Sequence, residues 1–105
     1  MRNLEKYKGV IPAFYACHDK EGNISPEGVQ GLTKYFVKKG VKGVYVNGSS
    51  GECIYQSVED RKIVLENVMK VAEGKLTVIA HVACNNTKDS QELARHAEGL
   101  GVDAI

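Results

Sequence analysis

The sequence lacks both a long hydrophobic run and an excess of charge of one sign. No apolar stretch is long enough to cross a membrane, and the opening Met-Arg-Asn-Leu-Glu-Lys-Tyr-Lys has no apolar core of the kind that signal peptides carry. Lysine and arginine number 14, against 13 aspartate and glutamate residues. This balance gives no electrostatic reason to expect a nucleic acid or a membrane as a partner.

Paired cysteines are absent too. The three cysteines, Cys17, Cys53 and Cys84, are odd in number, widely spaced and without a CxxC pair. This pattern is typical of free thiols in a reducing compartment, and it argues against both a disulfide framework and a structural zinc site. We therefore predict a cytoplasmic protein with no metal centre.

The composition is otherwise that of an ordinary globular protein. Hydrophobic residues make up 43% of the chain, which does not favour intrinsic disorder. A length of 105 residues suits one modest domain and is too short for two ordinary ones. We expect residues 1–105 to form a single domain.

Strand-like and helix-like segments alternate along the chain. Strands are predicted at residues 9–17, 41–47, 76–82 and 102–105. Pro12 argues against a regular strand at residues 9–17, because proline has no N–H to donate to the hydrogen bonds between strands. Strands that alternate with amphipathic helices imply an α/β fold with parallel pairing through right-handed crossovers. In such folds the loops that follow the strands build the ligand site.

Capping signals mark where the three intervening helices begin and end. Ser25 before Pro26 predicts a helix that runs to about Lys39, with Gly40 closing it. Ser57 opens a second helix through a capping box, and Gly74 ends it. A third helix begins at a cap on either Thr87 or Asp89. The residues expected to face inward are Val29, Leu32 and Phe36 in the first helix, Val64, Leu65, Val68 and Ala72 in the second, and Leu93, Ala94, Ala97 and Leu100 in the third.

The loop after the second strand is the most informative stretch. Val44-Tyr45-Val46 runs directly into Gly48-Ser49-Ser50-Gly51. Gly48 and Gly51 offer backbone freedom, while Ser49 and Ser50 offer hydroxyls beside backbone N–H groups. These four residues predict a small binding site for an anion such as a carboxylate. The alternative is an ordinary connecting turn, since glycine and serine are common in loops.

Other polar residues are predicted on the same edge of the sheet: Cys17, His18, Cys84, Asn85 and Asn86. Their spacing matches no metal-ligand pattern. His81 is interpreted as a hydrogen-bonded core residue, because it stands in an apolar strand. The charged runs at residues 38–39 and 59–62 are interpreted as solvated helix faces.

Asn47-Gly48-Ser49-Ser50-Gly51-Glu52 resembles the Gly-Gly-Ser-Thr-Gly-Glu loop of the N-acetylneuraminate lyases, or sialic acid aldolases. Those enzymes belong to the wider dihydrodipicolinate synthase group of class I aldolases. The resemblance continues at residues 8–14, 19–24, 79–82 and 101–104, so it covers nearly the whole chain in one register. Asn47 replaces the first glycine of the family loop, and Ser50 replaces a threonine.

The resemblance implies the first part of an eight-stranded (β/α)8 TIM barrel, with three βα units and the start of the fourth strand. It also implies that Ser49 and Ser50 hold the carboxylate of pyruvate or sialic acid. The family's Schiff-base lysine and proton-relay tyrosine lie later in the barrel, so no catalytic residue is expected in this chain. The reaction of the family uses no cofactor.

Three functional hypotheses follow from this resemblance. The chain is the N-terminal part of a lyase that is inactive alone, a non-catalytic module that binds carboxylates and associates with itself, or one subunit of a split lyase. Lys75, at the wrong end of the barrel, and Lys88, at a polar helix start, are not expected to replace the missing lysine. Unpaired sheet edges predict a homo-oligomer, or association with a chain that supplies the rest of the barrel.

Overall fold

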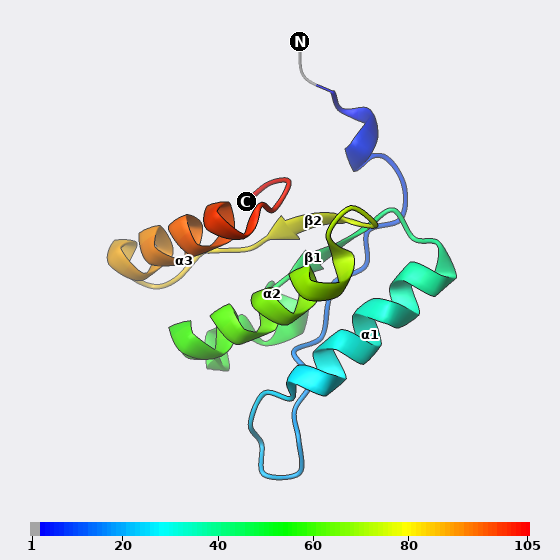
Figure 1. The fold of residues 1–105 in the computed structure, drawn as a ribbon. Coiled ribbons are helices and arrows are strands. Elements are labelled where there is room, and N and C mark those ends of the chain that lie inside the picture. The colour runs from blue at the N-terminus through cyan, green and yellow to red at the C-terminus, as the bar shows by residue number, and fades with distance from the viewer. Residues whose placement is uncertain (1–2) are drawn as a thin grey trace.

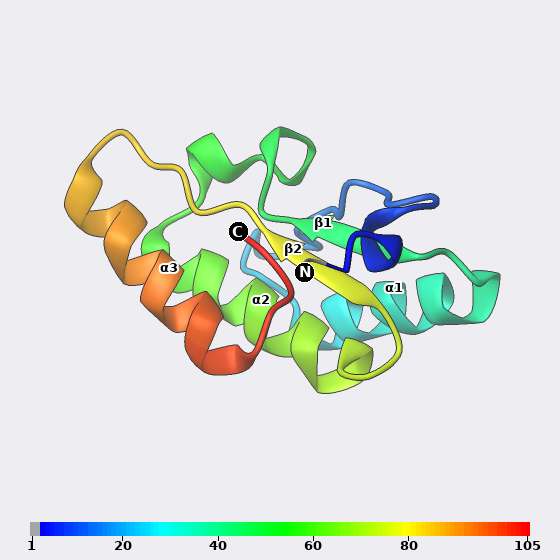
Figure 2. The same ribbon diagram turned by 90° about the horizontal axis from the view of Figure 1, so that it is seen from above.

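The computed structural model describes residues 3–105 as three α-helices on one side of a short parallel sheet (Figures 1 and 2). The helices are α1 (Pro26–Lys39), α2 (Val58–Ala72) and α3 (Thr87–Leu100), and the strands are β1 (Gly43–Val46) and β2 (Thr77–Ala80). Short 3-10 helices lie at η1 (Glu5–Tyr7), η2 (Ser49–Gly51) and η3 (Cys53–Tyr55). The register pairs Gly43 with Thr77 and Val46 with Ala80, so the two strands run in parallel as predicted.

The prediction of a regular strand at residues 9–17 is wrong. This segment runs beside β1 but forms only one parallel bridge, between Ala13 and Tyr45. The Phe14 N–H donates to the Tyr45 carbonyl, and the Tyr45 N–H donates to the Pro12 carbonyl, each at 2.9 Å. Pro12 has no N–H to donate, so toward the start of the segment only the Val10 carbonyl is engaged, which accepts from the Lys42 N–H at 3.0 Å.

The predicted strand at residues 102–105 is likewise reduced to one bridge, between Ala104 and Ile79. The Asp103 N–H donates to the Val78 carbonyl, and the Ala80 N–H donates to the Ala104 carbonyl, each at 2.9 Å. The segment therefore lies beside β2 and runs parallel to it. The four extended segments run in parallel as predicted, although only the two inner ones form regular strands.

The first two helices begin at the predicted capping residues. The Ser25 hydroxyl accepts a hydrogen bond from the Gly28 N–H at 3.0 Å, and Gly40 adopts the left-handed conformation that ends α1. The Ser57 hydroxyl accepts from the Asp60 N–H at 3.0 Å and opens α2. These bonds satisfy N–H groups that the first turn of a helix leaves free.

The predicted cap of the third helix is wrong by one residue or more. Asn86 caps α3, because its extended backbone lets its side-chain oxygen accept from the Asp89 N–H at 2.9 Å. Thr87 is already the first helical residue, and Asp89 is the donor in this bond rather than the cap. Asparagine is as good a capping residue as the two alternatives, so the sequence alone does not separate them.

The hydrophobic core lies between the helices and one face of the sheet. Phe14, Val44 and Val78 point into it, and each is at most 1% exposed. The predicted inward residues of α2 are all buried, whereas α1 and α3 each contribute some that are only partly buried. The opposite face of the sheet carries no α-helix within residues 3–105 (Figure 2), and Tyr15 on that face is 65% exposed. No helix in residues 3–105 is long and apolar enough to cross a membrane.

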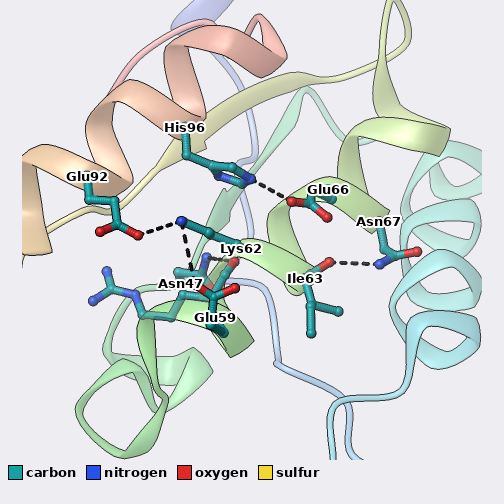
Figure 3. A network of polar contacts seen from close by, with 9 residues as sticks. Asn47, Glu59, Lys62, Ile63, Glu66, Asn67, Glu92 and His96 are labelled. Carbon is teal, nitrogen blue, oxygen red and sulfur yellow. Dashed lines mark hydrogen bonds and ion pairs between the residues drawn. The ribbon is translucent and has the colours of Figure 1, made fainter.

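Polar contacts hold α3 against α2 (Figure 3). Lys62 on α2 forms ion pairs with Glu59 on its own helix and with Glu92 on α3. One turn further along, Glu66 accepts from the His96 ring at 2.7 Å. These surface pairs each contribute modestly to stability, so we assign most of the helix packing to the buried apolar side chains.

Candidate functional site

The candidate site lies in the loop that follows β1. Asn47, the first residue after the strand, has a φ of 65°, and Glu52 has a φ of 57°. Between these two left-handed residues, the chain forms the single turn η2. The loop therefore turns twice and presents Ser49 and Ser50 on the surface, where both are exposed.

The two glycines of the loop are needed for space, which corrects the expectation of backbone freedom. Neither Gly48 nor Gly51 has a positive φ. A Cβ on Gly48 would lie 2.5 Å from the ring of Tyr45, and one on Gly51 would lie 2.9 Å from the carbonyl oxygen of Phe14. Both glycines are buried, so the loop packs its backbone directly onto the sheet.

The two serines are free to bind a ligand. Within residues 3–105, neither their hydroxyls nor their N–H groups have a hydrogen-bond partner. Polar groups that already face water can exchange it for a carboxylate at little cost. The geometry is compatible with a carboxylate site made of Gly48, Ser49, Ser50 and Gly51, which stays a prediction.

A cluster of polar residues, of which Asn47 and Arg61 are buried, anchors the start of this loop. The Asn47 amide donates to the main-chain carbonyl of Arg61 on α2 at 2.9 Å. The Nδ1 atom of His81, just after β2, lies 3.0 Å from the Asn47 carbonyl oxygen. His81 is hydrogen-bonded, as predicted, but it lies just after β2 and is only half-buried, so it is not a core residue. Its imidazole lies beside the ring of Tyr45.

Arg61 is the functional-site residue that the sequence analysis missed. It was interpreted as part of a solvated charged run, and this is wrong because its exposed fraction is only 3%. Its guanidinium donates to the carbonyls of His81 at 2.7 Å and Ala83 at 2.8 Å, and it contacts the Cys84 sulfur at 3.2 Å. The helical spacing carried a signal, since Arg61 stands three residues before Val64 on the buried stripe of α2.

The other residues predicted on this edge are brought together only in part. The Nε2 atom of His18 lies 3.3 Å from the side-chain nitrogen of Gln56. This contact joins the loop after residues 9–17 to the loop between β1 and α2. Cys17 is half-buried, and this burial raises the pKa of its thiol. Among residues 3–105, no three histidine, cysteine or acidic side chains are placed to hold a metal ion.

A cleft of about 510 Å³ lies between the loop after β2 and the start of α2. Its walls include Cys53, Ser57, Arg61, Cys84 and Asp89. Ser49 and Ser50 do not line it. The predicted carboxylate site is therefore a surface turn beside this cleft, rather than its floor.

Comparison with known proteins identifies the family of this chain. Residues 6–105 match the Dihydrodipicolinate synthetase family. The chain belongs to this family. The resemblance inferred from the loop and its flanking segments is thereby confirmed, and the dihydrodipicolinate synthetase family also accounts for the parallel α/β order.

Within this family the chain is similar to several N-acetylneuraminate lyases. The chain is 99% identical over all 105 residues to an N-acetylneuraminate lyase of Mediterraneibacter gnavus, and it covers 33% of that protein. It superposes with a TM-score of 0.98 on the structure of a Ruminococcus gnavus sialic acid aldolase catalytic lysine mutant, at 99% identity, covering 100% of this chain and 34% of that one. An N-acetylneuraminate lyase from Mycoplasma synoviae gives a TM-score of 0.94 at 36% identity, covering 98% and 36%.

The chain thus spans about a third of the length of the relatives that it matches. Its match lies in their N-terminal part, and these relatives are TIM-barrel lyases. The predicted fold, the first part of a (β/α)8 barrel, is confirmed. The three helices, the two strands and the two outer extended segments correspond to the first units of that barrel.

Proposed function

We propose that this chain supplies the carboxylate-binding part of an N-acetylneuraminate lyase. Residues 1–105 form one partial barrel domain, in which Ser49 and Ser50 bind the carboxylate of pyruvate or of sialic acid. The observation that carries the proposal is the exposed pair of unpartnered serines on a loop held tightly to the sheet. The 99% identity to a protein of that name supports the choice of substrate class.

The loop suits a carboxylate for chemical reasons. Neighbouring hydroxyl and N–H donors in one short turn can bind the two oxygens of such a group, and bonds to an ionised acceptor are stronger than neutral ones. Bonds to the carboxylate of a keto acid also fix the position of its carbonyl carbon. Fixing that carbon is how a binding loop assists attack by an amine held elsewhere.

We further propose that this chain does not cleave sialic acid unaided. Cleavage through a Schiff base requires an unprotonated lysine, which in turn requires desolvated surroundings or a neighbouring cation. Lys75 and Lys88 are the lysines considered for this role, and both side chains are exposed. The nucleophile therefore has to come from the remainder of a barrel, in the same polypeptide or in a second chain. No cofactor is required.

The test of carboxylate binding is a titration of the isotope-labelled chain with pyruvate, followed by NMR. We expect amide shifts centred on Ser49 and Ser50, and no such shifts with methyl pyruvate, which lacks the charged carboxylate. The double variant S49A/S50A should raise the Kd by about tenfold or more. Thr87→Ala removes an exposed hydroxyl at the start of α3 and should leave the Kd unchanged. Equal shifts with the ester would contradict a carboxylate site.

A second measurement addresses catalysis. The chain is incubated with pyruvate and borohydride and then weighed by mass spectrometry. We expect no stable pyruvyl adduct, because Lys75 and Lys88 are exposed to solvent, which keeps a lysine protonated. An adduct on any lysine would overturn the proposed inactivity. Carboxylate-dependent shifts without an adduct fit either a lyase part or a non-catalytic binding module, and restoration of cleavage by a chain carrying the remaining strands would favour the former.

A further inference from the structure

We infer that Asn47, Arg61 and His81 are positioning residues that fix the direction in which Ser49 and Ser50 meet a carboxylate. The inference rests on the proposed function of those serines and extends it to three residues that do not touch the ligand. Its starting point is a closed ring of contacts among these residues, which come from the loop after β1, from α2 and from the loop after β2.

The first side of the ring is made by Asn47. Its left-handed backbone sets the direction of the chain just before Gly48. Asparagine tolerates this conformation, which explains how it replaces the glycine of the resembled loop. Unlike glycine, it adds an amide, which donates to the Arg61 carbonyl at 2.9 Å. The substitution thus attaches the start of the serine loop to α2.

The second side is made by Arg61. One of its terminal nitrogens donates to the carbonyl of His81 at 2.7 Å, and the other donates to the carbonyl of Ala83 at 2.8 Å. The planar fork of a guanidinium can hold two carbonyls at once, which a lysine cannot do. The same residue therefore holds the serine loop through its main chain and the loop after β2 through its side chain.

The third side is made by the ring of His81. Its Nδ1 atom lies 3.0 Å from the carbonyl oxygen of Asn47. The same Nδ1 atom lies 3.5 Å from a terminal nitrogen of Arg61, which can only donate. A carbonyl oxygen can only accept, so the shorter of the two contacts assigns the proton of the neutral imidazole to Nδ1, and Nε2 keeps its lone pair. This bond joins the loop after β2 back to Asn47 and completes the closed set of contacts among Asn47, Arg61 and His81.

Burial makes the contacts among these three residues rigid. Asn47 is 5% exposed and Arg61 is 3% exposed. A buried donor or acceptor that loses its partner is not readily satisfied by water, so local opening is costly. In the turn that follows, the backbones of Gly48 and Gly51 pack against Tyr45 and Phe14, whereas the serine side chains are unpartnered within residues 3–105. Asn47 therefore sets the direction in which the chain enters this turn.

The test compares two nearly isosteric substitutions on the same structure. Asn47→Asp removes the donor to the Arg61 carbonyl, and Asn67→Asp removes a similar donor to the Ile63 carbonyl, which the Asn67 amide reaches at 2.8 Å. Both asparagines are 5% exposed, and both bonds end on α2, but Asn67 lies away from the serine loop (Figure 3). A purely structural role predicts the same behaviour for both variants.

We expect Asn47→Asp to raise the Kd for pyruvate by about tenfold. It should also speed amide exchange by a similar factor at Gly51 and Glu52, whose N–H groups donate to the Gly48 and Ser49 carbonyls within the turn. Asn67→Asp should change neither value by more than about twofold. Equal exchange rates in the two variants would overturn the inference. If the unmodified chain shows no pyruvate-dependent shift, the proposed function fails, while the exchange rates still decide whether the ring positions the turn.

Arg61→Lys supplies a second variant that keeps the charge and loses the fork. We expect the nitrogen chemical shifts of the His81 ring to show a proton on Nδ1 in the unmodified chain and in Asn67→Asp. In Arg61→Lys, a substantial population with the proton on Nε2 should appear, because the loop after β2 is no longer held. A ring that carries its proton on Nε2 in the unmodified chain would contradict the inference directly.

Discussion

The loop after β1 leaves no room for a side chain at Gly48. Gly48 is buried, and the ring of Tyr45 occupies the space where its Cβ would stand. The same reasoning distinguishes it from Gly31 on α1, where nothing lies within 4 Å of an added Cβ. Substitution by alanine at Gly48 and at Gly31 therefore adds the same methyl group to a crowded position and to an open one.

We predict that Gly48→Ala lowers the free energy of unfolding by about 1–3 kcal/mol, because the added methyl group displaces the Tyr45 ring. Gly31→Ala should instead raise it by about 0.5–1 kcal/mol, because alanine restricts the unfolded chain and favours a helix. Urea denaturation measures both values. Destabilisation of similar size at both positions would show that the close contact at Gly48 is not what matters.

Cys17 supplies a prediction of pH dependence. Burial raises the pKa of its thiol in the folded chain. Alkylation by iodoacetamide requires the thiolate, so the rate at Cys17 should rise at a higher pH than for a free cysteine, whose pKa is about 8.5. Peptide mapping by mass spectrometry measures the profile, and the urea-unfolded chain is the control that should return the ordinary midpoint.

The same shift has a consequence for stability. Since the folded-state pKa of Cys17 is raised, its contribution is fully present below the unfolded pKa and is lost as the pH rises through the folded value. We therefore predict that the free energy of unfolding falls above about pH 8.5, and that Cys17→Ser reduces this fall. Cys53→Ser is the matched control. An identical pH dependence in the unmodified chain and in Cys17→Ser would contradict the assignment.

At the scale of whole elements, the helix starts are the most local features of the fold. The bond from the Asp60 N–H to the Ser57 hydroxyl involves residues three positions apart, and the first turn of α2 leads directly to the buried Arg61. We predict that Ser57→Ala costs about 1 kcal/mol of unfolding free energy, whereas Ser57→Asp, which keeps a capping oxygen, costs little. Urea midpoints of the two variants decide this, and equal losses would rule out capping as the cause.

The strands behave differently from the helices at this scale. The two inner strands pair with neighbours on both sides, whereas residues 9–17 and 102–105 each pair along one edge through a single bridge. Their extended course is visible in the sequence. How far the hydrogen-bond ladder extends along them depends on main-chain donors and acceptors in both the segment and its neighbour. Pro12 has no N–H to donate.

At the scale of the whole molecule, the helix-free face of the sheet is the main unsatisfied feature. Tyr15 is 65% exposed on this face, and Tyr45 and Ile79 are only partly buried. Apolar surface of this kind, beside unpaired strand edges, favours association. We propose that this 105-residue chain forms dimers or larger assemblies, or binds a chain that supplies further strands.

Analytical ultracentrifugation at micromolar concentration tests this proposal. We expect species larger than a monomer, and we expect Tyr15→Glu to shift the distribution toward monomer because a charge on this face opposes contact. Tyr35→Glu is the matched control, since Tyr35 is 52% exposed on α1, on the other side of the molecule. A sharp monomer peak for the unmodified chain would contradict the proposal.

The fold was largely predictable because its determinants are local. Helix caps and apolar stripes involve residues a few positions apart, so α1 and α2 begin where Ser25 and Ser57 predict. The choice among Asn86, Thr87 and Asp89 was not predictable, because all three are suitable capping residues. The order of the strands followed from the alternation of strands and helices and from the family resemblance.

The candidate site was predictable only in part. Ser49 and Ser50 could be found because glycines and hydroxyls cluster in a loop after a strand. Arg61 could not be recognised as buried with any certainty, because its neighbours on both sides are charged. Its role depends on carbonyl groups about 20 residues further along the chain, which only the folded structure brings within reach.

The sequence by itself determined the alternation of strands and helices, the places where two of the helices begin, and the position of the serine loop, since each depends on interactions between near neighbours. Only the tertiary structure decided why Gly48 must be glycine, that Asn47 rather than a glycine takes the left-handed turn, and that Arg61 joins two loops. Those features depend on segments that are distant in the chain and meet only when the sheet and α2 are packed together.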